Sequence, residues 1–254
     1  MSQSSNTLFV GKVLLAFEVL ESTNKAAEEL IKKKEHIAEG TCINAAFQTS
    51  GKGQRGNTWE SEAGQNLLLS IILRPRFLAP KQQFLLNQIS SLALVDVISS
   101  LGIDQCLIKW PNDIYVNQDK IAGILIQNLL KGQQIEYSIL GIGLNVNQVF
   151  FSEGIPNPIS VRKLLGNAVN LNQLRQQLFS AIEKRYLQAK NNLAPLIEEY
   201  EELLYAKDQI RNFLDCSSEK VFTGVVRGVD DLGKIKIESG NEMKFFDFKE
   251  VKFL

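Results

Sequence analysis

Lys109 and Asp113 are well placed for chemistry, because the segment Lys109-Trp110-Pro111-Asn112-Asp113 sets an ammonium and a carboxylate on either side of a Trp-Pro pair. Proline and the residue before it disfavour helix, so the segment favours an extended turn. Ile114-Tyr115-Val116 follows, and then a polar turn and the run from Lys120 to Leu125. This pattern predicts that Lys109, Asp113 and Lys120 lie on two short adjacent strands. Two cations and a carboxylate there suit an anionic substrate with a bound metal.

A glycine-rich loop, residues 51–56, carries two further cations, Lys52 and Arg55. Free backbone N–H groups among cations form a good anion cradle, so the loop and the lysines together indicate chemistry on phosphates. The loop contains a literal G-x-G-x-x-G, but residues 57–64 favour no helix and no acid follows near residues 74–78. Both features argue against a dinucleotide-binding fold. Taken alone, the loop also fits a mobile surface segment, and Asp113 and Lys120 fit an ordinary strand-end carboxylate and a solvated lysine.

Composition excludes several functional classes. The chain has 254 residues, 44% of them hydrophobic, with zero net charge and a pI near 6.6, which argues against a general binder of nucleic acids or membrane surfaces. Cys42, Cys106 and Cys216 have neither a zinc nor a redox spacing, and so sparse a set is typical of a reduced, cytoplasmic compartment. His36 is the one histidine, and we expect it to be solvated, so a Ser-His-Asp triad is disfavoured. We identify no signal peptide and no apolar run long enough to span a membrane.

The elements that position these residues follow from periodicity. We expect strands at residues 13–19, 43–47 and 66–73, helices at 22–34 and 80–101, and a long loop at 48–65. Strands at 106–110, 113–116, 120–130 and 135–144 are separated by polar turns and should form antiparallel hairpins. Residues 160–206 carry helical patterning, in which the cluster of acids from Glu198 to Glu202 is interpreted as a solvated face. Alternation from about Phe213 predicts a small all-β module, such as an SH3-like barrel.

Four segments together resemble the biotin protein ligases, in the order of that family: residues 21–24, 48–59, 109–113 with 120–125, and 141–147. Lys-Trp-Pro-Asn-Asp followed by Lys-Ile-Ala-Gly-Ile-Leu is the most specific of them, and with the C-terminal module the resemblance spans nearly the whole chain. It implies an α+β fold, in which a mixed-sheet catalytic domain related to class II aminoacyl-tRNA synthetases (residues 1–212) precedes an SH3-like barrel (residues 213–254).

The resemblance implies a two-step reaction. The carboxylate of biotin, the substrate, would attack the α-phosphorus of MgATP and expel pyrophosphate, and a lysine of a biotin carboxyl carrier protein would then attack the biotinyl-5′-AMP anhydride. Apart from ATP and Mg²⁺, no tightly bound prosthetic group is implied. The family also suggests a homodimer formed through the sheet, for which the sequence gives no interface. We expect a cytoplasmic enzyme with no membrane partner.

The resemblance also implies roles for single residues. Lys120, Asp113 and Arg55 would be catalytic, with Asp113 holding Mg²⁺ or orienting the attacking lysine. The residues implied for biotin are Ser22, Thr23, Asn24, Gln48, Gly51, Lys52, Gly53, Gln54, Lys120, Gly123, Gly141 and Gly143. The residues implied for ATP are Lys52, Arg55, Trp59, Lys109, Asn112 and Asn145.

The chain departs from the family pattern at two places. The family loop is commonly G-R-G-R, whereas this chain has Lys52 and Gln54 in place of the two arginines. Lysine keeps the charge but loses the bidentate hydrogen bonding of arginine, and glutamine loses the charge. We hypothesise weaker retention of biotinyl-AMP unless Arg55 compensates. About 20 residues precede the first motif, too few for the DNA-binding domain of some members, so we expect no nucleic-acid partner.

Three rival interpretations stay open. A lipoate–protein ligase or octanoyltransferase shares the fold, but its RRxSGGG-type loop is missing. A non-catalytic biotin-binding regulator would not need both Lys120 and Asp113. The third interpretation, an NAD-dependent oxidoreductase, is supported only by the three glycines of the loop.

Overall fold

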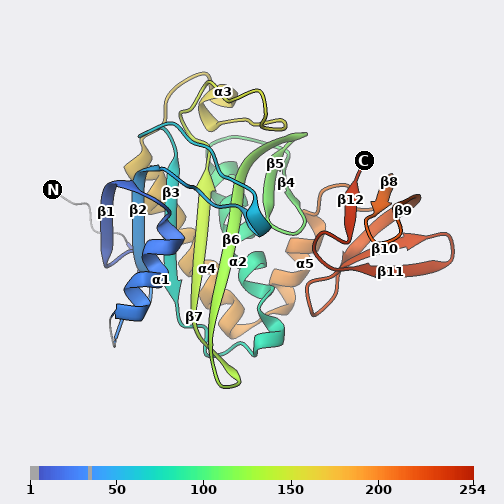
Figure 1. Cartoon of the computed structure of the whole chain (residues 1–254), viewed down its shortest axis with the longest axis horizontal. Coiled ribbons are helices and arrows are strands. Elements are labelled where there is room, and N and C mark those ends of the chain that lie inside the picture. The colour runs from blue at the N-terminus through green and yellow to red at the C-terminus, as the bar shows by residue number, and fades with distance from the viewer. Residues whose placement is uncertain (1–5, 34–35) are drawn as a thin grey trace.

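The computed structural model describes residues 6–33 and 36–254 and arranges them around two β-sheets (Figure 1). The larger sheet is built from strands β1 (Leu14–Leu20), β2 (Thr41–Gln48), β3 (Leu67–Leu73), β4 (Cys106–Lys109), β5 (Asp113–Val116), β6 (Asp119–Lys131) and β7 (Gln134–Leu144). The smaller sheet contains β8 (Ile210–Asp215), β9 (Lys220–Val229), β10 (Ile235–Ser239), β11 (Glu242–Phe246) and β12 (Val251–Phe253). The helices are α1 (Thr23–Lys33), α2 (Leu85–Ser100), α3 (Val161–Leu165), α4 (Leu171–Asn191) and α5 (Ala194–Glu202).

The larger sheet is mixed, with strand order β1-β2-β3-β7-β6-β5-β4. β1 and β2 are parallel because α1 carries the chain across between them, and the other pairs are antiparallel. β4 to β7 form the expected hairpins, so the sequence prediction of these strands is confirmed to within one or two residues. Lys109, Asp113 and Lys120, however, lie on three successive strands rather than two, because the chain turns between each of them.

β3 is an interior strand of the larger sheet, between β2 and β7, and all seven of its residues are buried. The run Leu-Leu-Leu-Ser-Ile-Ile-Leu is continuous rather than alternating, as expected for a strand covered on both faces. α1 covers one face, while α2, α4 and α5 lie behind the sheet (Figure 1). The predicted helix at 80–101 is present as a 3₁₀ turn, Pro80–Gln82, followed by α2 from Leu85.

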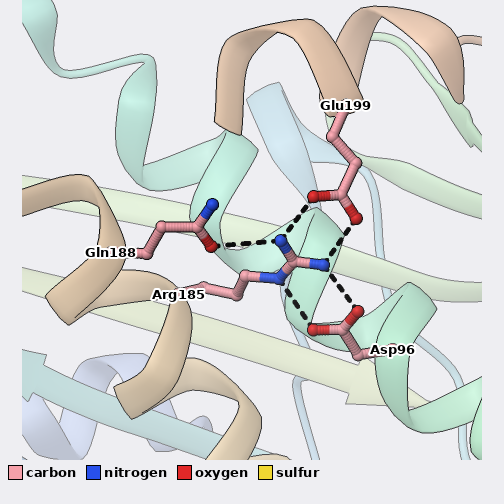
Figure 2. Close-up of polar contacts among 4 residues, drawn as sticks. All are labelled: Asp96, Arg185, Gln188 and Glu199. Carbon is pink, nitrogen blue, oxygen red and sulfur yellow. Dashed lines mark hydrogen bonds and ion pairs between the residues drawn. The ribbon is translucent and has the colours of Figure 1, made fainter. Parts of the chain in front are cut away.

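The three helices behind the sheet are joined by the guanidinium of Arg185 on α4 (Figure 2). It donates to both carboxylate oxygens of Asp96 on α2, at 2.7 and 2.6 Å, and to both of Glu199 on α5, at 2.5 and 2.6 Å. These hydrogen bonds raise the pKa of Arg185. Glu199 is therefore a structural ion-pair partner, so the interpretation of residues 198–202 as a solvated face is wrong at this position.

The smaller sheet is antiparallel, with order β11-β10-β9-β8-β12, and confirms the predicted C-terminal β module. Phe213, Phe222, Phe246 and Phe253 pack against one another inside it, with ring centroids 5.1 to 5.6 Å apart. The module begins with Ile210 in β8, three residues before the predicted boundary at residue 213. The division of the chain into residues 1–212 and 213–254 stays a prediction.

Several contacts hold the smaller sheet against the larger one. The indole Nε1 of Trp110 donates to the carbonyl oxygen of Gly233 at 2.9 Å, and the Trp110 ring packs edge-on against Phe248. On α5, Glu201 accepts a hydrogen bond from the backbone N–H of Val229. The turn after β4 is thereby fixed by the C-terminal module. Across the described residues, we find no helix with the length and apolar character needed to cross a membrane.

Candidate active site

A cavity of about 170 Å³ opens over the middle of β6 and β7, beneath the glycine-rich loop. It gathers most of the residues that the sequence singled out: Ser22, Thr23, Asn24, Gln48, Lys52, Gly53, Gln54, Trp59, Asn112, Asp113, Lys120, Gly123, Gly141 and Gly143. They come from the start of α1, the end of β2, the loop, the β4–β5 turn and the two strands. Residues as far apart in the sequence as Ser22 and Gly143 therefore meet at one site.

The end of the cavity beside α1 is lined by uncharged polar groups. Asn24 donates from Nδ2 to the carbonyl of Leu125 and to Gln127 Oε1, and its Oδ1 accepts from the hydroxyl of Ser70 at 2.6 Å. Gln48 Oε1 accepts from the backbone N–H of Thr23 at 2.7 Å. These hydrogen bonds fix the side chains of Asn24 and Gln48 in positions from which each can also bind a small polar ligand.

Sequence reasoning missed Ser70, which is fully buried and holds this polar end together. Its hydroxyl also lies 2.8 Å from Thr23 Oγ1. The signal was a single serine inside the apolar run of β3, since a buried hydroxyl needs a partner.

Glycines in β6 and β7 make room for side chains inside the cavity. A Cβ atom on Gly141 would lie 2.2 Å from Asn24 Oδ1, and one on Gly143 would lie 2.5 Å from Cε2 of Trp59. A Cβ on Gly123 would meet the same indole at 3.0 Å. The Trp59 ring thus rests directly on the backbone of both strands, and its buried Nε1 finds no hydrogen-bond partner within the described part of the chain.

The glycine-rich loop folds back on itself over the cavity. Gly53 N–H donates to the carbonyl of Asn57 at 2.7 Å, and Trp59 N–H donates to the carbonyl of Gly51 at 2.9 Å. Between them lies a 3₁₀ turn, Gln54–Gly56. The side chain of Arg55, a predicted catalytic residue, lies outside what the structure describes. Gly51, the first residue of the loop, is buried and does not line the cavity.

Lys120 provides the cation at the centre of the site. Its Nζ lies 2.7 Å from Asp113 Oδ1 and 5.7 Å from the centre of a Trp59 ring. The backbone of Lys120 is fixed as well, because its N–H donates to Asn157 and its carbonyl accepts from Ile159. A rigid backbone with a mobile four-carbon side chain lets the ammonium reach an anion on either side of the residue.

A second cavity, of about 490 Å³, adjoins the first on the far side of Lys120. Asn57, Thr58, Trp59 and Lys120 line both. Asn145 lines the second cavity as well, and the remaining walls include Phe151, Ile155, Pro156 and Pro158. Sequence reasoning missed these last four, although proline and aromatic residues between β7 and α3 could have indicated a shaped apolar loop.

Lys109 and Asn112, two residues predicted to contact ATP, lie in different surroundings. Asn112 lines the first cavity, and its Nδ2 donates to the carbonyl of Ile124 at 2.6 Å, which joins the β4–β5 turn to β6. Lys109 lines neither cavity, and its Nζ lies 4.7 Å from the centre of the Tyr115 ring. Burial lowers the pKa of Lys109 and raises the pKa of Tyr115 to about 12.

Comparison with known proteins places this geometry in context. Residues 16–145 match the model of the biotin/lipoate A/B protein ligase family. The bifunctional ligase/repressor BirA of Bacillus subtilis is 31% identical over 242 residues, which are 94% of this chain and 73% of that protein. The biotin–[acetyl-CoA-carboxylase] ligase of Mycobacterium tuberculosis is 27% identical over 88% of this chain and 83% of that protein.

Solved structures show the same fold. A biotin protein ligase from Aquifex aeolicus, in complex with biotin and ATP, superposes with a TM-score of 0.79 at 22% identity and covers 96% of this chain and 99% of that one. A biotin protein ligase from Leishmania major, in complex with biotinyl-5-AMP, superposes with a TM-score of 0.61 at 19% identity, over 93% and 99% of the two chains. The predicted class, a mixed catalytic sheet with a small C-terminal β module, is confirmed.

Proposed function

Because the chain belongs to the biotin/lipoate A/B protein ligase family, we propose that it is a biotin–[acetyl-CoA-carboxylase] ligase, which joins biotin to a carboxylase with ATP as co-substrate. In finer detail, the acceptor is one lysine of a biotin carboxyl carrier protein, and biotinyl-5′-AMP is the intermediate. The observation that carries this proposal is the position of Lys120 between two adjoining cavities of different chemistry.

The first cavity suits biotin. Its uncharged end, built from Ser22, Thr23, Asn24 and Gln48, offers both donors and acceptors to the polar ring of that molecule. The Trp59 ring lies over the strand glycines, where it offers an apolar wall to a ring and its aliphatic chain. The biotin carboxylate then points toward Lys120. Lipoate and octanoate lack a comparable polar head, so these hydrogen-bonding groups would be left without partners.

The second cavity suits the nucleoside of ATP. It is larger, and Phe151, Ile155, Pro156 and Pro158 give it apolar walls that suit a nucleobase. With the base there, the α-phosphate reaches Lys120 from the opposite side to biotin. The proposed contacts with the nucleotide are Lys52, Trp59, Asn112 and Asn145. Arg55 is also proposed as a contact, because it belongs to the glycine-rich loop.

In the first step, a biotin carboxylate oxygen forms a bond to the α-phosphorus of ATP, and the bond from that phosphorus to pyrophosphate breaks. Both reactants are anions, so the approach is unfavourable unless cations offset their repulsion. Lys120 contacts the carboxylate and the α-phosphate at once and stabilises the charge that develops between them. The loop at residues 51–56 closes over the product and excludes water from the anhydride.

In the second step, the neutral amine of the acceptor lysine attacks the acyl carbon of biotinyl-5′-AMP. An amide bond forms, AMP leaves with the bonding electron pair, and the amine loses a proton. Asp113 lies beside Lys120, where its carboxylate orients the amine. Lys120 stabilises the departing phosphate.

A magnesium ion fits this site as a partner of the nucleotide. Asp113 offers one carboxylate, and the described residues contain no cluster of three or more candidate ligands. Mg²⁺ in proteins is often held by one or two carboxylates together with substrate phosphates and water, which is the set available here. When bound, the ion would neutralise phosphate charge. A homodimer, a cytoplasmic location and the absence of nucleic-acid binding stay predictions.

The decisive experiment incubates the purified protein with MgATP, labelled biotin and a biotin-accepting carrier domain, and measures label bound covalently to the carrier. We expect transfer that requires ATP and is lost in Lys120→Ala. Biotin-dependent pyrophosphate exchange without transfer would show the activation step with an unsuitable carrier. Activity with lipoate or octanoate in place of biotin would instead assign the chain to the lipoate branch of its family. Biotin binding with neither exchange nor transfer would identify a non-catalytic regulator.

A further inference from the structure

Lys109 is a charged residue that the proposed mechanism leaves without a role. It ends β4 directly opposite Asp113, which begins β5, and the two are register partners in the antiparallel pair. Residues opposite each other in such a pair present their side chains on the same face, with Cβ atoms about 5 Å apart. The Lys109 ammonium therefore lies on the same side of the sheet as the Asp113–Lys120 ion pair.

The surroundings of Lys109 are aromatic rather than acidic. Its Nζ lies 4.7 Å from the ring centre of Tyr115, 5.3 Å from that of Tyr205 and 5.7 Å from that of Phe253. These rings come from β5, from the turn after α5 and from β12, and they pack against one another. An ammonium over several ring faces is stabilised by their quadrupoles. We call Tyr115, Tyr205 and Phe253 the cage.

The cage holds a cation that has no carboxylate of its own. No ion pair joins Lys109 to an acid anywhere in residues 6–33 and 36–254, whereas Asp113 is paired with Lys120 at 2.7 Å. The charge of Asp113 nevertheless favours the charged form of Lys109 and opposes the lowering of its pKa by burial. Asp113 thus interacts with two ammonium groups and contacts one of them, that of Lys120.

This arrangement matters when an anion enters the site. Lys120 cannot keep its full interaction with Asp113 while it contacts a ligand carboxylate and a phosphate. A carboxylate whose side chain is only 24% exposed would then lose its counter-charge, at a substantial energetic cost. Lys109 lies opposite Asp113 in the strand pair, and the two charges already interact, so Lys109 is the second cation beside this carboxylate.

We propose that Lys109 is a positioning residue that compensates the charge of Asp113 when Lys120 turns toward an anionic ligand, and that the cage holds it there. The inference rests on the proposed function, because it requires Lys120 to contact the biotin carboxylate. It also gives the C-terminal module a task, since Phe253 contributes one wall of the cage.

The test compares the binding of biotin with that of its alcohol, in which the carboxylate is reduced to a CH₂OH group, by titration calorimetry. Only biotin draws Lys120 from Asp113, so Lys109→Met should weaken the binding of biotin by about tenfold and leave the alcohol unchanged. Lys109→Arg keeps the charge and the stacking and should restore the affinity for biotin. Lys131→Met, at the exposed hairpin between β6 and β7, is the matched control and should change neither affinity.

Equal losses for both ligands in Lys109→Met would indicate a packing role and overturn the inference, and so would unchanged affinity for biotin. Phe253→Leu removes one wall and no charge, and should give a smaller loss that is again confined to biotin. A wild-type protein that binds neither ligand would overturn the proposed function, and the inference with it. Binding by the wild type with no difference between the variants would overturn the inference alone.

Discussion

Lys120 and Asp113 form an ion pair, with Nζ of the lysine 2.7 Å from Oδ1 of the carboxylate, at the junction of two cavities. Their side chains are only 28% and 24% exposed, so the pair is partly shielded from water and not an ordinary surface contact. Among the described residues, Lys120 carries the ammonium that lines both cavities, and Asp113 carries the carboxylate of the first cavity. The proposed reaction requires Lys120 to leave Asp113 and contact a ligand.

The first prediction concerns Lys120 itself. Lys120→Met keeps the length of the side chain and removes the charge, so it should lower the rate of biotin-dependent pyrophosphate exchange by about 10²- to 10³-fold. The physical reason is that two anions must meet without the cation between them. Lys131→Met tests for a general effect of losing a lysine from β6 and should retain the wild-type rate. A Lys120→Met rate within threefold of wild type would be incompatible with the proposed role.

The second prediction uses the close approach of Trp59 to the backbone of β7. In Gly143→Ala the new Cβ would lie 2.5 Å from Cε2 of Trp59, so the indole must move. Because this ring forms a wall of the first cavity, we expect a loss of biotin affinity of roughly 1–3 kcal/mol, typical of overpacking. Titration calorimetry would measure it.

A control for that variant lies at the far end of the same two strands. Gly132, in the β6–β7 turn, has a φ of 60° and no neighbouring atom within 4 Å of a Cβ. Asparagine tolerates such a conformation, so Gly132→Asn should bind biotin as the wild type does. Equal affinity in Gly143→Ala and Gly132→Asn would show that Trp59 does not shape the binding site.

The third prediction concerns stability, through the ion pairs of Arg185 (Figure 2). Its side chain is 7% exposed, and its removal would leave Asp96 and Glu199 facing each other without a cation. Arg185→Met should therefore lower the free energy of unfolding by about 3 kcal/mol, as measured by urea denaturation.

Lys184 precedes Arg185 on α4 and is exposed, so Lys184→Met is a matched control with little expected effect. Biotin affinity should be unchanged in both variants, because α4 lies behind the sheet (Figure 1) and contributes no residue to the wall of either cavity. If Arg185→Met were as stable as wild type, the network would contribute nothing to holding the three helices together.

Local patterns were enough to predict the elements of the fold. The continuous apolar run at residues 66–73 indicated a strand, and polar turns marked the hairpins from β4 to β7. Alternation from Phe213 onward indicated the C-terminal module. The strand order was not predictable from periodicity, since β3 pairs with β7 across more than 60 intervening residues. Such a pairing depends on how the apolar faces of all the strands and helices pack together, and the sequence of a single segment does not contain that information.

The site was predictable where one segment carried its own signal. Lys120, Asp113 and the glycines of β6 and β7 belong to compact motifs, and the structure brings them together. Ser70 and Phe151 were missed because each acts through residues distant in the sequence. The surroundings of Lys109 were hidden for the same reason, since Tyr205 and Phe253 are supplied by later parts of the chain.

The last prediction concerns Gln54, where the loop lacks a cation that the family pattern commonly has. Gln54 opens the 3₁₀ turn Gln54–Gly56 and lines the first cavity. Gln54→Arg would add a charged donor beside the phosphate of biotinyl-5′-AMP. Hydrogen bonds to charged groups contribute about 1.5–3 kcal/mol, so release of the intermediate should slow by roughly tenfold or more. The rate of release can be followed with labelled intermediate after a chase with unlabelled biotin and ATP.

Two controls separate the charge from its position. Gln54→Met removes hydrogen bonding without adding charge, and should release the intermediate at least as fast as wild type. Gln83→Arg places a cation on the neighbouring groove, which Gln83 lines together with Gln54, but outside the first cavity, and should leave the release rate unchanged. An unchanged rate in Gln54→Arg would overturn the hypothesis that the missing cation at this position weakens retention of the intermediate.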